Sequence, residues 1–379
     1  MSISGRRVHI AGSTAIDADA ELLTAAHRMI RRATRLIIEA GGGLVAGMGG
    51  EPIGESGQPC IFDWTVLETL AEAPDPAPNW PGGQAGRFRA VASQRALEKI
   101  PDWRKEVWTR IRKRSDFELE TAPPGWRMGG IVRVLQELRG DGLVVLSGGA
   151  GSEQLAELYL EDGKPVIPIR CDLGAIVGDG KGGSTYLYDR ALNEGDTFCP
   201  LRAGVGGAAA RLSALRLDRA GDPSALATAL VELLEDLRPP LAFYARLVDP
   251  DIDSYKAVEH FFRRVVDPVV VEKGFTPHEV GRDPPRAAFM NVEIFQTLHK
   301  SSLAVVDLTA VRPNCMMELG YALARRRRVI ISAMKGTELP FDPDKLPTFF
   351  WHLERDTQDL LNEYKRWLER YIDMPPIVG

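Results

Sequence analysis

The stretch Leu303–Ala333, LAVVDLTAVRPNCMMELGYALARRRRVIISA, decides which fold is expected for this chain. It opens with the apolar run Leu303–Val306, which is too short for a helix and suits a buried parallel strand. Asn314 is a good N-cap residue, and apolar residues then recur at helical spacing. The run Val329–Ala333 predicts the next buried strand, so the stretch indicates one strand–helix–strand element of a parallel sheet.

Polar residues fall at the places in this stretch where ligands bind in parallel sheets. Asp307 follows the first strand directly, and Glu318 lies in the first turn or so of the helix. Ligands of open α/β sheets occupy the crevice at the carboxyl ends of the strands. The stretch therefore brings two carboxylates and the Asn314 amide to one crevice. A purely structural interpretation stays open, in which Asp307 caps a turn and Glu318 complements the helix dipole.

These residues resemble the signature of the nucleoside 2-deoxyribosyltransferase-like proteins, which are neighbours in fold of the TIR-like NAD-cleaving domains. The similar residues are Asp307-Leu308-Thr309, Pro313-Asn314 and Glu318-Leu319-Gly320-Tyr321-Ala322, and the resemblance covers roughly residues 241–333. It implies that Glu318 attacks, or supports attack at, the anomeric carbon of a ribose. Asp307 and Asn314 would then orient ribose hydroxyls or the attacking water.

Composition limits the classes of protein to which the chain can belong. Its 379 residues predict two domains, or three by length alone, and 44% hydrophobic with 26% charged residues is ordinary for a globular protein. The net charge of −5 argues against a general nucleic-acid binder, and no apolar run approaches a membrane span. The four cysteines are far apart and form no C-x-x-C pair, so neither a metal site nor a disulfide framework is expected. We expect a cytoplasmic protein.

The whole chain is predicted to be α/β, with two Rossmann-like domains, each a mainly parallel sheet flanked by helices. The helix-breaking sequence Arg238-Pro239-Pro240 places the boundary between residues 1–238 and 239–379. In the first domain, the Pro/Gly-rich segment Pro74–Gly86 is expected to be an exposed, mobile loop. The segment Ala90–Arg114 is expected to be helical, with Trp103 and Trp108 in packing or interface roles.

A glycine-rich turn, Gly148–Ser152, follows the predicted strand Leu143–Leu146 and leads into a helix. Such turns direct backbone N–H groups at an anion. A tight turn without a ligand remains the alternative.

The turn resembles the phosphate loop of the LOG/DprA superfamily, and the resemblance implies a nucleotide-signal site. Leu155 occupies the position where LOG hydrolases carry a catalytic Glu. The domain is therefore similar to the sensing modules called SLOG rather than to the hydrolases. The residues of the implied site are Gly12, Ser13, Gly49, Arg127, Gly148, Gly149, Gly151 and Ser152.

Three residues of the second domain could complete the crevice around Glu318. Tyr244, Arg246 and Asp283 follow predicted strand ends and are candidate substrate-binding residues. The alternative is that they are surface groups in contact with water.

The resulting hypothesis is a bacterial anti-phage immune effector. A nucleotide signal, of the cyclic ADP-ribose type or a cyclic nucleotide, binds the SLOG domain and activates N-glycosidic cleavage in the second domain. NAD or another nucleotide is the substrate, no cofactor or metal is needed, no nucleic acid or membrane is involved, and a homo-oligomer is expected. Two alternatives remain: a metabolic nucleoside transferase or hydrolase without signal control, and a non-catalytic nucleotide-binding protein.

Overall fold

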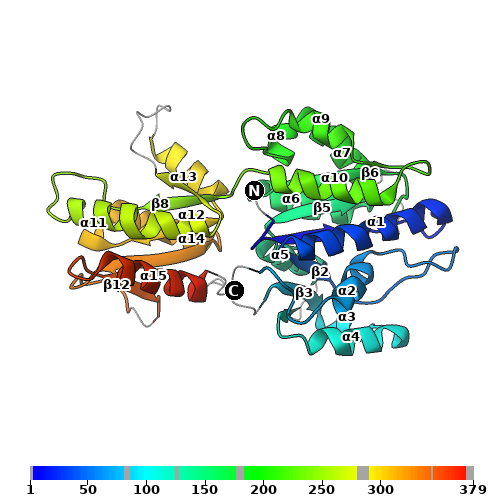
Figure 1. The fold of residues 1–379 in the computed structure, drawn as a ribbon, viewed down its shortest axis with the longest axis horizontal. Coiled ribbons are helices and arrows are strands. Elements are labelled where there is room, and N and C mark those ends of the chain that lie inside the picture. The colour runs from blue at the N-terminus through cyan, green and yellow to red at the C-terminus, as the bar shows by residue number, and fades with distance from the viewer. Residues whose placement is uncertain are drawn as a thin grey trace. The chain divides into compact units, whose positions relative to one another are not determined.

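The structure, a computed structural model, describes residues 3–80, 86–123, 128–175, 183–279, 290–342 and 345–372. The chain divides into two compact units, Met1–Arg238 (unit 1) and Pro239–Gly379 (unit 2). Each unit is a sheet covered by helices (Figure 1). All the strand pairs of the two sheets are parallel, which confirms the predicted α/β class.

Unit 1 is built on a seven-stranded sheet with β1 and β5 at its centre. The strands in sheet order are β4 (Phe117–Ala122), β3 (Phe88–Ser93), β2 (Gly43–Gly47), β1 (Arg7–Ala11), β5 (Gly142–Leu146), β6 (Val166–Cys171) and β7 (Arg216–Leu217). The order reverses between β2 and β5, on either side of β1. In parallel sheets the crevice at such a switch point is where ligands bind.

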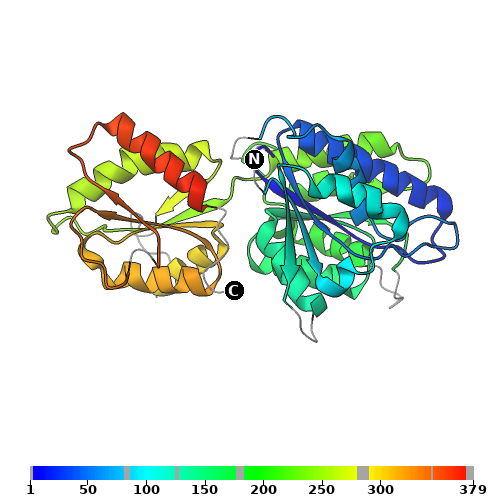
Figure 2. The same ribbon diagram turned by 90° about the horizontal axis from the view of Figure 1, so that it is seen from below.

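Helices cover both faces of this sheet (Figure 2). α1 packs beside α2 and α10, whereas α5, α6 and α7 pack side by side. The bounds are α1 (Ala20–Glu39), α2 (Asp63–Glu72), α3 (Gln94–Leu97), η1 (Asp102–Arg104), α4 (Lys105–Arg112), α5 (Met128–Arg139), α6 (Ala150–Glu161), α7 (Gly183–Asn193), α8 (Gly195–Phe198), α9 (Ala208–Ser213) and α10 (Pro223–Asp236).

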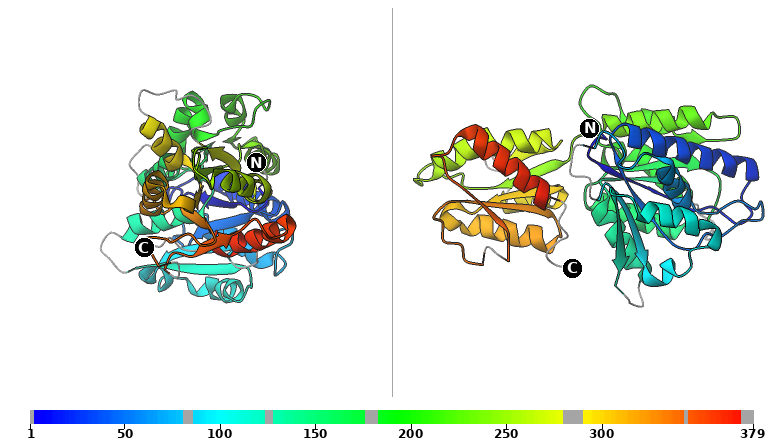
Figure 3. Two further views of the ribbon diagram at one scale, coloured as in Figure 1. Left: turned by 90° about the vertical axis from the view of Figure 1, so that its left-hand side faces the viewer. Right: turned by 60° about the horizontal axis from the view of Figure 1, so that its bottom comes forward.

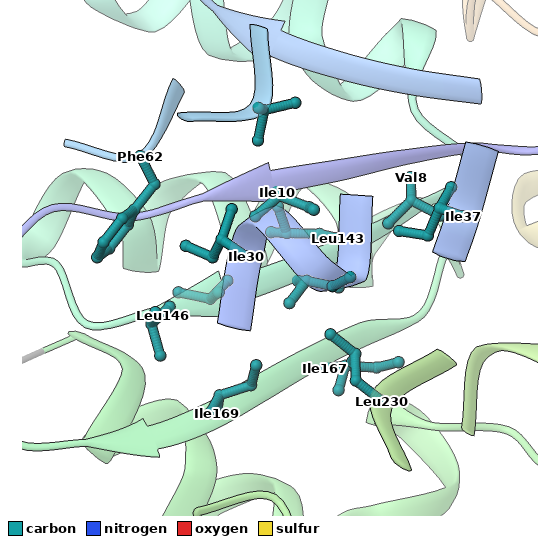
Figure 4. Packing of buried hydrophobic residues seen from close by; sticks show 14 of the residues in the cluster. Val8, Ile10, Ile30, Ile37, Phe62, Leu143, Leu146, Ile167, Ile169 and Leu230 are labelled. Atoms are coloured by element: carbon teal, nitrogen blue, oxygen red, sulfur yellow. The ribbon is translucent and has the colours of Figure 1, made fainter. Parts of the chain in front are cut away.

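The core of unit 1 lies between α1 and the central strands (Figure 4). Ile30 and Ile37 are two helical turns apart, so both lie on the face of α1 that meets the sheet. They are buried together with Val8 and Ile10 of β1 and Leu143 of β5. Each such side chain contributes about 1.5–3 kcal/mol when it is fully buried. This packing attaches α1 to the central strands β1 and β5.

One prediction for unit 1 was wrong. The segment 90–114 is not one helix, because β3 runs to Ser93 and is followed by short helices; a short strand buried in a parallel sheet has no periodicity of its own. Residues 74–80 form a loop, as predicted, and most of them are exposed, but two buried arginines hold its backbone. Arg114 donates to the carbonyl oxygens of Ala73 and Pro74, and Arg87 donates to those of Ala77 and Pro78. Residues 81–85 lie outside the described part of the chain.

Unit 2 has a five-stranded parallel sheet. Its strands in sheet order are β12 (Thr348–Trp351), β11 (Arg328–Met334), β10 (Leu303–Asp307), β8 (Leu241–Ala245) and β9 (Thr276–Glu279). The helices are α11 (Tyr255–Phe261), the π-helix η2 (Phe262–Val266), α12 (Asp267–Glu272), α13 (Met290–Lys300), the 3₁₀ turn η3 (Thr309–Val311), α14 (Pro313–Ala324) and α15 (Thr357–Tyr371). Across the described ranges of both units, no helix is long and apolar enough to span a bilayer.

The two faces of this sheet carry separate cores. One contains buried residues of α11, η2, α12 and α15, and the other contains residues of α13 and α14. α14 and α15 therefore lie on opposite faces (Figure 3). The π-helix immediately precedes Asp267-Pro268, where the proline has no N–H group for a regular helical bond. β12 was not predicted, because its few residues show no period that separates a strand from a helix.

Candidate functional site

The helix that carries Glu318 begins immediately after β10 and a short turn. Pro313 is the first residue of α14, and Arg312, not Asn314, is the N-cap residue. Asn314 is therefore inside the first turn and is exposed. The prediction that it caps the helix was wrong. Proline is favoured at the first helical position, so the helix begins at Pro313, before Asn314.

Glu318 lies in the second turn of α14 and is half-buried. Its carboxylate has no hydrogen-bond or ion-pair partner among the residues that the structure describes. Burial raises the pKa of Glu318 to about 7. A half-buried carboxyl group without a partner, at the carboxyl end of a sheet, is typical of a functional site rather than of a structural one.

The neighbours of Glu318 on α14 define one face of the helix. Asn314 lies four residues before it and Tyr321 three residues after it, so the three side chains share that face. The Tyr321 hydroxyl is 2.9 Å from Nδ1 of His299, and its ring centroid is 5.0 Å from that of Phe295. This face therefore meets α13 at Tyr321 and leaves Asn314 open to solvent.

Asp307 is completely buried. Its Oδ2 accepts hydrogen bonds from Oγ of Ser332 at 2.7 Å and from Nε1 of Trp351 at 2.9 Å, and its Oδ1 accepts one from the backbone N of Thr309 at 3.1 Å. Burial raises the pKa of Asp307, and these hydrogen bonds oppose that shift. The structure thus places Asp307 inside the unit, whereas Glu318 is partly open to solvent.

Tyr244 and Arg246 are also internal, so the structure contradicts their assignment as open substrate contacts. Arg246 is ion-paired with Glu259 at 2.5 Å and with Glu279 at 2.8 Å. Tyr244 is buried with its ring edge-on to Phe262, and this burial raises the pKa of its hydroxyl. The sequence could not show these partners because they come from other elements.

The third predicted substrate contact, Asp283, lies outside the described residues.

A cavity of about 530 Å³ opens at the carboxyl ends of β11 and β12. Its volume is in the range of small-ligand sites. It is lined by Ala257, Met334, Lys335, His352, Leu353 and Glu354. Trp351, the Asp307 partner, directly precedes this lining, so the cavity adjoins the strand ends that Asp307 holds together. None of its polar residues was predicted, because the segment around β12 showed no strand pattern.

In unit 1, the predicted glycine turn lies at the switch point of the sheet. Ser147 and Gly148 have positive φ values of 57° and 93°, and α6 begins just after them. A Cβ on Gly12 would lie 1.9 Å from the carbonyl oxygen of Leu146, so the ends of β1 and β5 need glycine there. A Cβ on Gly148 would lie 3.6 Å from the backbone N of Ser13. The structure therefore brings Gly12, Ser13 and the glycine turn together.

The start of α7 closes one side of this turn. The N–H of Gly183 donates to the carbonyl oxygen of Gly148, and Oγ of Ser184 accepts from the N–H of Ser147 at 2.7 Å. The N–H groups of Ala150 and Gly151 have no acceptor in the described parts of the chain. Two helices thus begin at one place, and free N–H groups at helix starts favour an anion.

Arg133 is a cation that the structure places beside this turn, and the sequence did not single it out. Its Nη2 lies 2.7 Å from the point where a Cβ of Gly151 would be, and its Nη1 donates to Oε1 of Gln154 at 2.7 Å. Arg133 belongs to α5, and it reaches the glycine turn because α5 packs beside α6. The predicted cation, Arg127, lies outside the described residues.

Gly49 is not placed at the glycine turn by any of its described contacts. A Cβ on Gly49 would lie 3.3 Å from that of Ala96, and its carbonyl oxygen accepts from Nε1 of Trp64. Leu155 is buried in the core beneath α6, so no carboxylate occupies that position.

Another carboxyl group lies at the end of β2. Oδ1 of Asp63 accepts a hydrogen bond from the N–H of Gly47 at 2.6 Å, and burial raises the pKa of Asp63 to about 6.

The N-terminal part of the chain matches a known protein family. The family described as ATP nucleosidase Cap17-like, N-terminal, matches residues 3–236. The chain belongs to this family. The Cap17-like match lies within unit 1, so unit 2 and Glu318 are outside it.

Two relatives are each described as ATP nucleosidase Cap17, one from Escherichia coli strain KTE188 and one from Escherichia coli. Each is 28% identical over 174 residues, which are 46% of this chain and 34% of the relative. The chain thus spans about a third of the length of these relatives. A solved structure of DNA processing protein A from Helicobacter pylori aligns with a TM-score of 0.32 and 14% identity, over 51% of this chain and 74% of that chain.

Proposed function

We propose that this chain cleaves the N-glycosidic bond of a nucleotide and that Glu318 carries the chemistry. The observation on which the proposal rests is the half-buried, unpartnered carboxyl group of Glu318, whose pKa burial raises to about 7. ATP is the first substrate to consider, because the relatives of the Cap17-like part are described as ATP nucleosidases. NAD, with the same kind of ribosyl bond, is the second.

The reaction needs a group that accepts a proton from water and then donates it to the departing base. As the bond from C1′ to the base nitrogen breaks, positive charge develops on the ribose, and an ionised Glu318 stabilises it. Water then bonds to C1′ and gives a proton to Glu318, which passes it to the departing base. With ATP and water as reactants, the products are adenine and ribose 5-triphosphate. A pKa near the working pH suits a group that must accept and release a proton.

Asn314 and Asp307 have different places in this proposal. The exposed Asn314 amide, one turn before Glu318, is free to donate to or accept from a ribose hydroxyl. Asp307, completely buried, acts on the crevice only through the elements that it holds.

Unit 1 is proposed to be the sensor of an anti-phage effector. The start of α6, with Arg133 beside it, suits the phosphate groups of a nucleotide signal. With Leu155 in the core, a bound signal is expected to stay intact. A signal activates only if it binds the active state more tightly than the inactive state, and we expect this difference to arise in a homo-oligomer.

A second candidate assigns base release to unit 1 itself. It is favoured by the Cap17-like match, which covers unit 1 only, and by the half-buried Asp63 at the end of β2, whose pKa burial raises to about 6. On this reading Asp63, not Glu318, lies beside the ribose.

The test is product analysis by chromatography on the full chain. Wild type, Glu318→Gln and Asp63→Asn are each incubated with ATP, NAD and deoxynucleosides, with and without cyclic ADP-ribose and cyclic nucleotides. We expect free adenine from wild type and a loss of about 1000-fold in Glu318→Gln, the size of an acid–base contribution. Glu338→Gln, an exposed glutamate of the same unit, is the matched control and should keep full activity.

The outcomes separate the candidates. If Asp63→Asn loses adenine release and Glu318→Gln keeps it, the catalytic site lies in unit 1. Turnover of deoxynucleosides that ignores every signal favours a metabolic enzyme. Tight binding of nucleotides without any product favours a non-catalytic binding protein.

A further inference from the structure

The turn between β10 and α14 contains two strained residues that are not glycine. Ala310 has φ 62° and ψ 10°, and Val311 has φ 45°. A β-branched residue at positive φ is rare, and each such residue costs about 1–3 kcal/mol. Such conformations persist only where surrounding contacts determine them. The contacts of this turn should therefore be strong, and they lie directly before the helix of Glu318.

Backbone and side-chain bonds tie the turn to β11. The N–H of Leu308 donates to the carbonyl oxygen of Ser332 at 2.8 Å, and the N–H of Met334 donates to Oγ1 of Thr309 at 2.9 Å. The N–H of Thr309 donates in turn to Asp307. Thr309 is buried, so these bonds are shielded from water. The turn is thus attached both to the neighbouring strand and to the Asp307 carboxylate.

Asp307 extends the same network to β12. It receives one hydrogen bond from Ser332 on β11 and one from Trp351 on β12, at 2.7 and 2.9 Å. The Trp351 ring is itself stacked on Phe261 at 4.4 Å between centroids, with 8° between the planes. One buried carboxylate therefore joins the ends of three strands, and the packing of Phe261 sets the position of the Trp351 donor.

We propose that Trp351 and Ser332 are positioning residues for Glu318. They hold Asp307, Asp307 and Thr309 hold the strained turn, and the turn determines where α14 begins and so where Glu318 lies. The inference rests on the proposed role of Glu318 in base release. A displacement of a reacting group by about 1 Å can cost about 100-fold in rate, so the network has a measurable consequence.

The first experiment compares Trp351→Phe with Trp367→Phe in the full chain. Phenylalanine keeps the stack on Phe261 but removes the N–H that binds Asp307. The matched control, Trp367, packs against the same core beside Phe349 and Tyr371 and does not bind Asp307 in the described part of the chain. For adenine release from ATP, we expect kcat to fall about tenfold in Trp351→Phe, the worth of one hydrogen bond to a charged group, with KM almost unchanged. Ser332→Ala should change kcat in the same direction.

Two further readouts exclude a general loss of packing. The midpoint of the pH–rate profile, set by Glu318, should move in Trp351→Phe and stay in Trp367→Phe. In a Glu318→Gln background, Trp351→Phe should lower the residual rate no further, because the two changes act through one group. Equal rates and midpoints in the two tryptophan variants would contradict the inference.

A measurement without substrate separates this inference from the proposed function. The difference in unfolding free energy between wild type and Glu318→Gln, followed against pH, reports the pKa of Glu318. The same difference measured with Trp351→Phe present in both chains should give a shifted midpoint. If Glu318→Gln releases adenine at the wild-type rate, the proposed function fails while this titration still decides the positioning. If Glu318→Gln is inactive and the midpoint does not move, only the positioning inference fails.

Discussion

The glycine turn of unit 1 and the start of α14 in unit 2 are the same kind of place with opposite chemistry. Both follow central strands of parallel sheets, where ligands bind. The glycine turn offers free N–H groups and the Arg133 guanidinium, and Leu155 fills the position of a carboxylate. The start of α14 offers the carboxyl of Glu318 and no neighbouring cation that binds it among the described residues.

The difference lies in what each place can stabilise. Fixed donors and a cation favour an anion that is bound and released unchanged. A half-buried carboxyl with a pKa near 7 favours proton transfer and a developing positive charge. Two similar crevices in one chain can therefore divide sensing from chemistry, and the following experiments test that division.

Among the three effects that follow, the largest is expected from charge reversal in the glycine turn region. Arg133→Glu should weaken binding of a nucleotide signal about 100-fold, because charge-assisted hydrogen bonds are lost and repulsion replaces them. Calorimetry with cyclic ADP-ribose and cyclic nucleotides measures this, and Arg110→Glu on the exposed face of α4 is the matched control. Adenine release measured without signal should be the same in both variants. Equal affinities in the two variants would remove the anion site from unit 1.

The rate of base release should depend on pH through Glu318. Burial raises the pKa of Glu318 to about 7, so the fraction of ionised Glu318 decreases as the pH is lowered below 7. On that acid side, kcat should drop about tenfold per pH unit. Steady-state rates between pH 5.5 and 8.5 provide the test, with Glu338→Gln expected to give the wild-type profile. A profile that rises toward acid would mean that the protonated form is the active one, and would reverse the role given to Glu318.

The smallest effects are expected in stability. Glu318 has a folded pKa of about 7 against an ordinary 4.5, so the unfolded chain ionises first and the folded state loses stability as pH rises through this window. Glu318→Gln removes this cost and should be more stable than wild type by about 1–2 kcal/mol at pH 8, after allowance for partial exposure, and equal to it at pH 4.

Asp63→Asn makes the same comparison in unit 1. Its window runs from 3.8 to about 6, so the difference from wild type should be complete by about pH 7, one pH unit lower than for Glu318. Denaturant unfolding of the full chain at several pH values checks both variants. If the two midpoints coincide, or if neither variant gains stability at high pH, the two carboxyl groups are not buried as the structure places them.

Much of the architecture was predictable because local patterns determine it. The apolar run Leu303–Val306 is too short for a helix and therefore predicted a buried strand. The glycines around Gly148 predicted a turn, because glycine adopts positive φ without the steric cost of a Cβ, and the structure gives Gly148 a positive φ. These patterns predicted the α/β class and the strand ends that carry the sites. Strands such as β3 and β12 escaped prediction, because a few buried residues show no period that separates strand from helix.

The sequence by itself determined which residue types stand at the strand ends, and with them the pairing of a glycine turn and a carboxylate-bearing helix. Only the tertiary structure decided which of these groups are available. Asp307 looks like the partner of Glu318 in the sequence, but Ser332 and Trp351, from later strands, bury and bind it. Arg246 is likewise taken by Glu259 and Glu279. Burial and pairing depend on residues far apart in the chain, so no local pattern contains them.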